Sequence, residues 1–252
     1  MQKFLRTVVE PYAVPVIMSL AYLFLLEASD PSGTAKVLLG VAFGGVILTW
    51  VAFRELRAHA NASRAAAIGA ADELVTSAAD QVERRMFARS RAPFLVYLAI
   101  GHEQRGDFDA ATAVLDRAEQ ERALKPAWQL LAATTRLAIL VERGDAAGAR
   151  ALYERGIGPA TQRMAGPGPR LLAEEALARV RFAEGDHAAA APMFDKMSGD
   201  VRLGPATRAF AHYYAARCAE ARGDHDLAQR RFADAAHLAP ETYAAKKQPA
   251  TA

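Results

Sequence analysis

The residue types that carry most enzyme chemistry are scattered along this chain. None of the histidines belongs to a His-x-x-x-His or His-Glu-x-x-His pattern, the spacings that place zinc ligands on one helical face. The chain also lacks a Gly-x-x-x-x-Gly-Lys phosphate loop and a Gly-x-Ser-x-Gly elbow. We therefore predict a protein that is not an enzyme and that binds no cofactor and no metal. The histidines considered are His102, His187, His212, His225 and His237.

The only cysteine, Cys218, cannot form an intrachain disulfide or a paired-cysteine metal site. We expect it to be a small buried residue, because an isolated cysteine on a helix packs more often than it reacts. The tripeptide Arg-Gly-Asp, known from adhesion motifs, occurs at 105–107, 143–145 and 222–224. Each copy falls on a predicted turn between helices, so we interpret it as turn chemistry.

Gly-Asp pairs at four predicted turns, about 40 residues apart, divide the second half of the chain into units. Glycine tolerates the left-handed conformation that ends a helix, and an aspartate side chain accepts hydrogen bonds from the free N–H groups that begin the next one. The pairs are separated by 38, 41 and 38 residues, so each unit should contain two helices. They are Gly106-Asp107, Gly144-Asp145, Gly185-Asp186 and Gly223-Asp224.

A small-large-small apolar stripe at helical spacing follows every turn. With Pro240 closing the last unit, this pattern resembles the tetratricopeptide repeat, although the units exceed that family's period of about 34 residues. The resemblance implies an all-α solenoid of about four helix pairs over residues 92–242, with first helices lining a concave groove. The stripes are Ala111, Leu115 and Ala118; Ala149, Tyr153 and Gly156; Ala190, Phe194 and Met197; and Ala228, Phe232 and Ala235.

Two apolar runs lie close to the N-terminus, at 8–26 and 37–53. The first would extend about 28 Å as a helix, close to the thickness of a bilayer's hydrocarbon core. We predict a transmembrane helical hairpin over residues 1–57, with a cleaved signal peptide or a buried hairpin as the alternatives. Gly40 and Gly44, with Gly45 adjacent, have the spacing that lets helices approach closely in lipid.

Basic residues predict the orientation of this hairpin. Lys3 and Arg6 precede the first run and Arg54 and Arg57 follow the second, whereas the connection carries only Lys36. Positive residues favour the cytoplasmic side, so both termini should lie there, at the inner membrane. This plan resembles that of bacterial membrane-anchored tetratricopeptide proteins, including the HemY-like group, in architecture alone.

The remaining segments follow from composition. Residues 58–91 carry an amphipathic pattern typical of one linking helix, which either caps the solenoid or binds a partner. The Gly/Pro-rich stretch 158–170 should be a flexible connection, and 243–252 a disordered tail. Residues 92–240 hold 19 Lys and Arg against 19 Asp and Glu, which argues against nucleic-acid binding.

The function predicted from this architecture is binding. We expect a membrane-anchored scaffold that holds a protein partner, a peptide or a helix, in the groove; the alternative is an accessory subunit that contacts a membrane enzyme through its spans. A clamp for C-terminal carboxylates is not expected, because the only asparagine, Asn61, lies outside the repeats. The resemblance places groove positions on Val96, Ile100, Glu103, Gln104, Thr134, Ala138, Glu142, Glu175, Arg179, Phe182, Tyr213, Arg217 and Glu220.

Overall fold

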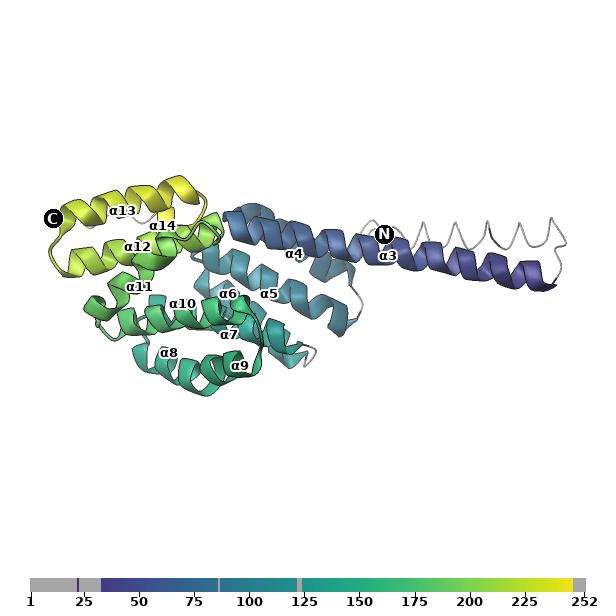
Figure 1. Ribbon diagram of the computed structural model, residues 1–252, viewed down its shortest axis with the longest axis horizontal. Helices are drawn as coiled ribbons and strands as arrows, with labels where there is room; N and C mark the ends of the chain where they lie inside the picture. The colour runs from purple at the N-terminus through teal and green to yellow at the C-terminus, as the bar shows by residue number, and fades with distance from the viewer. Residues whose placement is uncertain (1–21, 23–32, 86, 122–123, 247–252) are drawn as a thin grey trace. The chain divides into compact units, whose positions relative to one another are not determined.

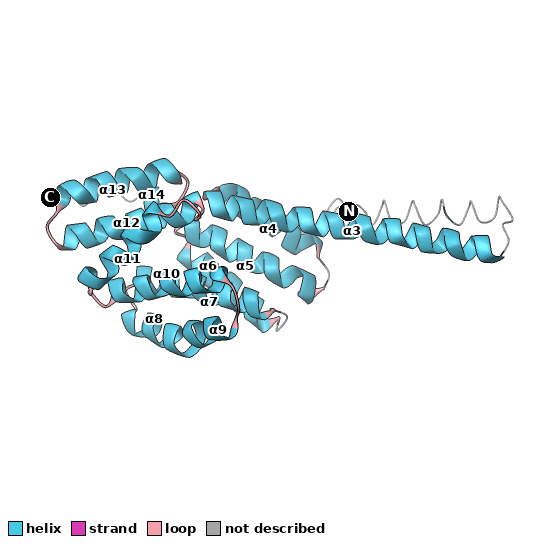
Figure 2. Cartoon of the chain, viewed as in Figure 1, coloured by secondary structure: helices cyan, strands magenta, loops and turns pink. Residues whose placement is uncertain are grey.

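The computed structural model describes residues 22, 33–85, 87–121 and 124–246 (Figure 1). Within these ranges every regular element is a helix and no strand occurs (Figure 2), so the all-α prediction is confirmed. The helices are α3 (Gly33–Ile68), α4 (Ala71–Arg84), α5 (Ala88–Arg105), α6 (Phe108–Gln120), α7 (Pro126–Glu142), α8 (Ala146–Leu152), the π-helical turn η2 (Tyr153–Ile157), α9 (Gly158–Arg163), α10 (Pro167–Ala183), α11 (His187–Gly199), α12 (Pro205–Ala221), α13 (His225–Leu238) and α14 (Tyr243–Lys246).

The chain divides into two compact units. The first contains the residues up to Asn61 together with Glu83–Met86, and the second contains Ala62–Val82 and the residues from Phe87 onward. We call the second the repeat unit. It holds the four helix pairs α5/α6, α7/α8, α10/α11 and α12/α13, each joined at one of the Gly-Asp turns.

The four turns have the backbone that their glycines predict. Gly106, Gly144, Gly185 and Gly223 have φ angles of 85°, 77°, 79° and 78°, in the left-handed region. Each helix therefore ends at a residue that bears no strain from a side chain.

The aspartates cap three of the four following helices. Asp145, Asp186 and Asp224 accept hydrogen bonds from the backbone N–H three residues on, at 2.8, 3.1 and 3.1 Å. Asp107 makes no such bond, which corrects the prediction for the first unit. Its carboxylate lies 3.3 Å from Arg105 Nε and 3.6 Å from His102 Nδ1, so basic groups at the end of α5 hold it instead.

The apolar stripes form the interfaces within the helix pairs. The stripes of the first, third and fourth helix pairs are buried, as predicted. In the stripe of the second helix pair only Ala149 is buried. The reason is that α8 ends at Leu152, and the π-helical turn η2 shifts the following residues around the helix axis. The chain then continues as α9, so the predicted flexible stretch 158–170 is largely helical. Prolines at the starts of α9 and α10 are compatible with this, because a first-turn residue needs no N–H donor.

The first helices of the pairs form an inner layer that closes on itself. α5 contacts α7, α7 contacts α10 and α10 contacts α12, while α14 contacts both α12 and α5. The closing side chain is Tyr243, whose ring lies 5.3 Å from that of Phe108 and 5.1 Å from that of Phe210. Residues 243–246 are thus helical and packed, which corrects the prediction of a disordered tail there; 247–252 lie outside the described residues.

The predicted single linking helix, 58–91, is divided among α3, α4 and the start of α5, and the first break lies at Gly69. This glycine has φ 76°, and a Cβ built on it would lie 2.8 Å from Ala239 Cβ and 3.1 Å from Thr242 Cγ2. On the other side of the break, a Cβ on Gly101 of α5 would lie 2.8 Å from Val75 Cγ2 of α4. Within the repeat unit, the α3–α4 corner therefore packs against α5 and against the segment that follows α13, because small residues allow close approach at each contact.

In the N-terminal compact unit, the second predicted span, 37–53, lies within α3. The first predicted span, 8–26, lies outside the described residues except for Tyr22. The Tyr22 ring stacks on that of Phe43 at 5.1 Å. A Cβ on Gly40 would lie 2.9 Å from Tyr22 Oη, whereas Cβ atoms on Gly44 and Gly45 would meet no described atom within 4 Å. Across the part of the chain described, no helix combines the length and the apolar character that crossing a membrane requires.

The capping difference between units is testable. We expect Asp224→Ala to lower the free energy of unfolding by about 1 kcal/mol, because it removes a cap hydrogen bond. Asp107→Ala should cost about half as much or less, because exposed ion pairs contribute little. Urea unfolding of the purified variants measures both, and equal losses would contradict the assignment of caps.

The close approach at Gly69 predicts a second difference. Gly69→Ala adds left-handed strain of about 1–2 kcal/mol and also overlaps the Ala239 methyl group. Gly144→Ala, at nearly the same φ but with no atom of the described residues within 4 Å, adds only the strain. Thermal unfolding should therefore show a clearly lower Tm for Gly69→Ala, and a similar Tm for the two variants would argue against the packed corner.

Candidate binding cavity in the repeat unit

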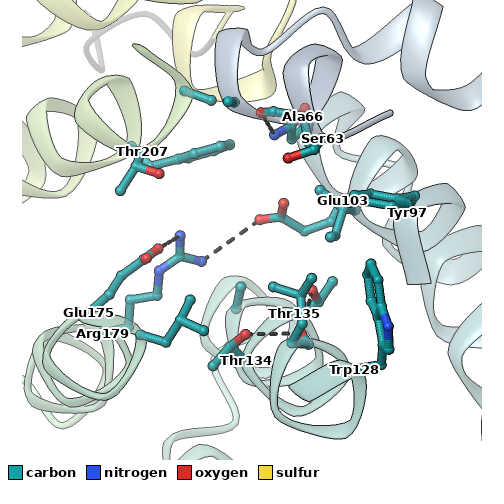
Figure 3. A pocket seen from close by; sticks show the side chains of 18 residues that line it. Ser63, Ala66, Tyr97, Glu103, Trp128, Thr134, Thr135, Glu175, Arg179 and Thr207 are labelled. Carbon is teal, nitrogen blue, oxygen red and sulfur yellow. Dashed lines mark hydrogen bonds and ion pairs between the residues drawn. The ribbon is translucent and has the colours of Figure 1, made fainter. Parts of the chain in front are cut away.

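The inner layer encloses a cavity of about 320 Å³ (Figure 3). Its walls come from the last turns of α3 and from α5, α7, α10 and α12. Ser63 and Ala67 of α3 are exposed at its edge and Thr207 of α12 is half-buried, so the cavity reaches solvent. These helices bring together residues that lie more than 140 positions apart in the chain.

The cavity contains about half of the predicted groove positions. Glu103 and Arg179 face each other across it (Figure 3), whereas Val96, Phe182 and Tyr213 are buried in the packed interior. The reason is the tight closure of the inner layer, which packs the other first-helix faces against one another rather than along an open groove. Those that line the cavity are Ile100, Glu103, Gln104, Thr134, Ala138, Glu175 and Arg179. Those that do not are Val96, Glu142, Phe182, Tyr213, Arg217 and Glu220.

Glu142 shows how the remaining part of the predicted groove is filled. Its side chain is 1% exposed and accepts a hydrogen bond of 2.8 Å from the Tyr214 hydroxyl. Arg217 Nη1 lies 3.5 Å from the same carboxylate, and the Arg217 guanidinium stacks 4.7 Å from the Phe182 ring centre. A carboxylate at the end of α7 is thus neutralised by α12, and the two helices are tied together.

Arg179 is the central charge of the repeat unit. It is 6% exposed, and its Nη2 donates to Glu175 at 2.7 Å. Its guanidinium also lies 5.2 Å from the Tyr214 ring centre and 5.6 Å from that of Phe210. A buried guanidinium is tolerated only when anions and aromatic faces replace its water, and α10 and α12 supply both.

Glu103 is the less satisfied partner. Its Oε1 lies 3.7 Å from Arg179 Nη1, too long for a hydrogen bond, and this buried oxygen has no hydrogen-bond partner among the described residues. Burial raises the pKa of Glu103 to about 7; Arg179 opposes this shift, and the Glu175 and Glu142 carboxylates add to it. The group is therefore near half-ionised at neutral pH.

Gln104 presents a second unmatched acceptor beside it. Its Nε2 donates to the Ala66 carbonyl at 2.9 Å, which ties α5 to the end of α3. Its Oε1 is buried and accepts no hydrogen bond from any described residue. Two neighbouring side chains thus bring unused acceptor oxygens to one cavity.

The aromatic wall was not predicted from the sequence. Tyr97 of α5 and Trp128 of α7 meet edge to face, with ring centres 5.1 Å apart, on the side of Glu103 away from Arg179 (Figure 3). Tyr97 lies one helical turn before the predicted Ile100, a spacing that could have identified it. Trp128 lies at the start of its helix, and the contributions of α3 and Thr207 depend on tertiary packing, so no local pattern indicates them.

Other reactive residue types show no gathered site in the described chain. Cys218 is fully buried, as expected, and burial raises the pKa of its thiol to about 11, so it stays protonated at neutral pH. The described residues contain no cluster of three or more His, Cys, Asp or Glu side chains suited to a metal ion. The groups that the cavity offers to a ligand are therefore one guanidinium, two carboxylates and three aromatic side chains, Tyr97, Trp128 and Phe210.

No protein-family model, no curated protein and no solved structure matches the chain.

The raised pKa of Glu103 predicts how stability depends on pH. The folded protein holds this proton up to about pH 7, whereas the unfolded chain releases it near 4.5. The stabilisation from this group is thus present in full below pH 4.5 and is lost as the pH rises through about 7. Relative to Glu103→Gln, the wild-type free energy of unfolding should fall by roughly 2–3 kcal/mol between pH 5 and pH 8.

Urea unfolding across this pH range measures the difference in the free energy of unfolding between wild type and Glu103→Gln. The contributions of other titrating groups cancel because both proteins contain them. Glu174→Gln, an exposed carboxylate on α10 paired with Lys196 at 2.9 Å, is the matched control and should follow the wild type. Parallel curves for wild type and Glu103→Gln would contradict the raised pKa.

Proposed function

We propose that this protein is a membrane-anchored helical-repeat scaffold that binds a protein partner in the cavity of its repeat unit. The observation that carries the proposal is the cavity itself, a solvent-reaching space lined by inner helices and holding acceptors that the described chain leaves unmatched. Stacked helix pairs use such inner surfaces to bind extended peptides or helices. The tetratricopeptide resemblance of the turns and stripes supports the same proposal.

The proposed anchor is the N-terminal region, with both termini on the cytoplasmic side of the inner membrane. Large apolar side chains on α3 are exposed, among them Val41, Leu48, Phe53 and Leu56, at 62–71%. Water-exposed apolar rows of this kind favour contact with lipid or with another apolar surface. The charge pattern around the two apolar runs supports the orientation.

The second candidate is an accessory subunit that contacts a membrane enzyme through its spans. Gly44 and Gly45 favour it, because Cβ atoms on them would meet no atom of the described residues within 4 Å, and glycines at this spacing allow close approach of a partner helix. Gly40, in contrast, already lies against Tyr22.

Site-directed photocrosslinking in native membranes separates the two candidates. One protein carries the photoreactive group at Thr207, which lines the cavity, and another carries it at Leu48, exposed on α3. Arg230, exposed on α13, gives the matched control for nonspecific capture. The scaffold predicts a specific partner captured from Thr207 and not from Arg230.

Capture of a membrane protein from Leu48 alone would replace the scaffold with the accessory subunit. The anchor is tested separately by alkaline carbonate extraction, after which we expect the full chain to stay with the membranes. Release into the supernatant would contradict the anchor without affecting the crosslinking result.

A further inference from the structure

The charges of the cavity are not balanced. Glu103 and Glu175 contribute two carboxylates to its lining, and Arg179 is the only Lys or Arg among the lining residues. Arg179 directs its short hydrogen bond of 2.7 Å to Glu175 and lies 3.7 Å from Glu103. When Glu103 is ionised, the lining therefore carries one surplus negative charge, located at the carboxylate that projects into the space (Figure 3).

The unmatched groups are acceptors. Glu103 Oε1 and Gln104 Oε1 are both buried without a hydrogen-bond partner among the described residues. The hydroxyls of Thr134 and Thr135 are already used, because both donate to the Leu131 carbonyl at 2.9 Å. A ligand that only donates would satisfy these oxygens, and the ammonium of lysine and the guanidinium of arginine are the side chains that only donate and carry positive charge.

The aromatic wall fits the same ligand. Tyr97 and Trp128 lie beside Glu103, and aromatic rings next to a carboxylate attract cations through their electron-rich faces. An acidic ligand would instead face two carboxylates and a single guanidinium, which is already hydrogen-bonded to Glu175. The cavity volume of about 320 Å³ accommodates one long side chain but not a whole helix of a partner.

We propose that this cavity binds a basic side chain, a lysine or arginine of a partner protein, with Glu103 and Gln104 as acceptors and Tyr97 and Trp128 as the aromatic wall. The proposal deepens the function proposed above, since it names the chemistry of the partner at the same site. The two proposals can fail separately. Binding of basic peptides in the cavity would still support this proposal if no partner were captured in membranes, and capture of a partner from Thr207 would still support the scaffold if the cavity showed no preference for basic peptides.

The chain offers its own reporter for the test. Its two tryptophans are Trp50 and Trp128, so full-length Trp50→Phe protein in mild detergent has one tryptophan, in the cavity. The probes are capped Gly/Ser peptides with a single central lysine, norleucine or glutamate. We expect the lysine peptide to change Trp128 fluorescence near pH 8 and to bind at least about tenfold more tightly than the other two.

Variants in the same background locate the binding. Glu103→Gln should weaken the lysine peptide about tenfold or more, and Glu174→Gln, outside the cavity, should not change it. Tyr97→Leu keeps the charges and should weaken binding about threefold to tenfold. Between pH 6 and pH 8 the affinity of the Trp50→Phe protein should rise about tenfold as Glu103 ionises beside Arg179, Glu175 and Glu142, and that of Glu103→Gln should stay constant.

Three results would overturn the proposal: a glutamate or norleucine peptide that binds as well as the lysine peptide, equal affinities in Glu103→Gln and Glu174→Gln, or no fluorescence change with lysine peptide up to about 10 mM. Circular dichroism identifies a variant that fails to fold. In that case the comparison of the three peptides on the Trp50→Phe protein still decides the question.

Discussion

The repeat unit depends on keeping one guanidinium, that of Arg179, out of water. Removing a charge from water costs several kcal/mol unless anions and aromatic faces replace the solvent. Glu175 supplies the close anion from the same helix, Glu103 supplies a second from α5, and the rings of Phe210 and Tyr214 supply the faces from α12. Three inner helices must therefore converge on one point, which restricts how far the helix pairs can separate.

Closure of the inner layer is the second consequence of that convergence. Once α12 is drawn toward α5, the C-terminal segment reaches the first helix pair, and Tyr243 packs against Phe108. The corner at Gly69 covers the joint because it has no side chain to hold Ala239 away. With the inner layer closed in this way, the first helices do not line one long open groove, and the cavity beside Glu103 lies among them.

The cavity inherits its chemistry from incomplete neutralisation. Arg179 cannot form short hydrogen bonds with both carboxylates in the present geometry, so Glu103 has a raised pKa and an unmatched oxygen. At the other end of the inner layer the Glu142 carboxylate accepts a hydrogen bond from Tyr214 and pairs with Arg217. The contrast between two buried carboxylates separates a structural cluster from a candidate binding site.

The sequence by itself determined the local features: all-helical content, four Gly-Asp turns, three of the four buried stripes and a buried Cys218. Each depends on residues within one or two helical turns, where backbone conformation and helical spacing act directly. Only the tertiary structure decided which first-helix residues line a cavity and which are packed, that Gly69 breaks the linking segment, and that Tyr243 packs. These features depend on the angle between successive helix pairs. Contacts between residues about 75 positions apart, such as Arg179 and Glu103, determine this angle, so the local spacing of residues does not predict it.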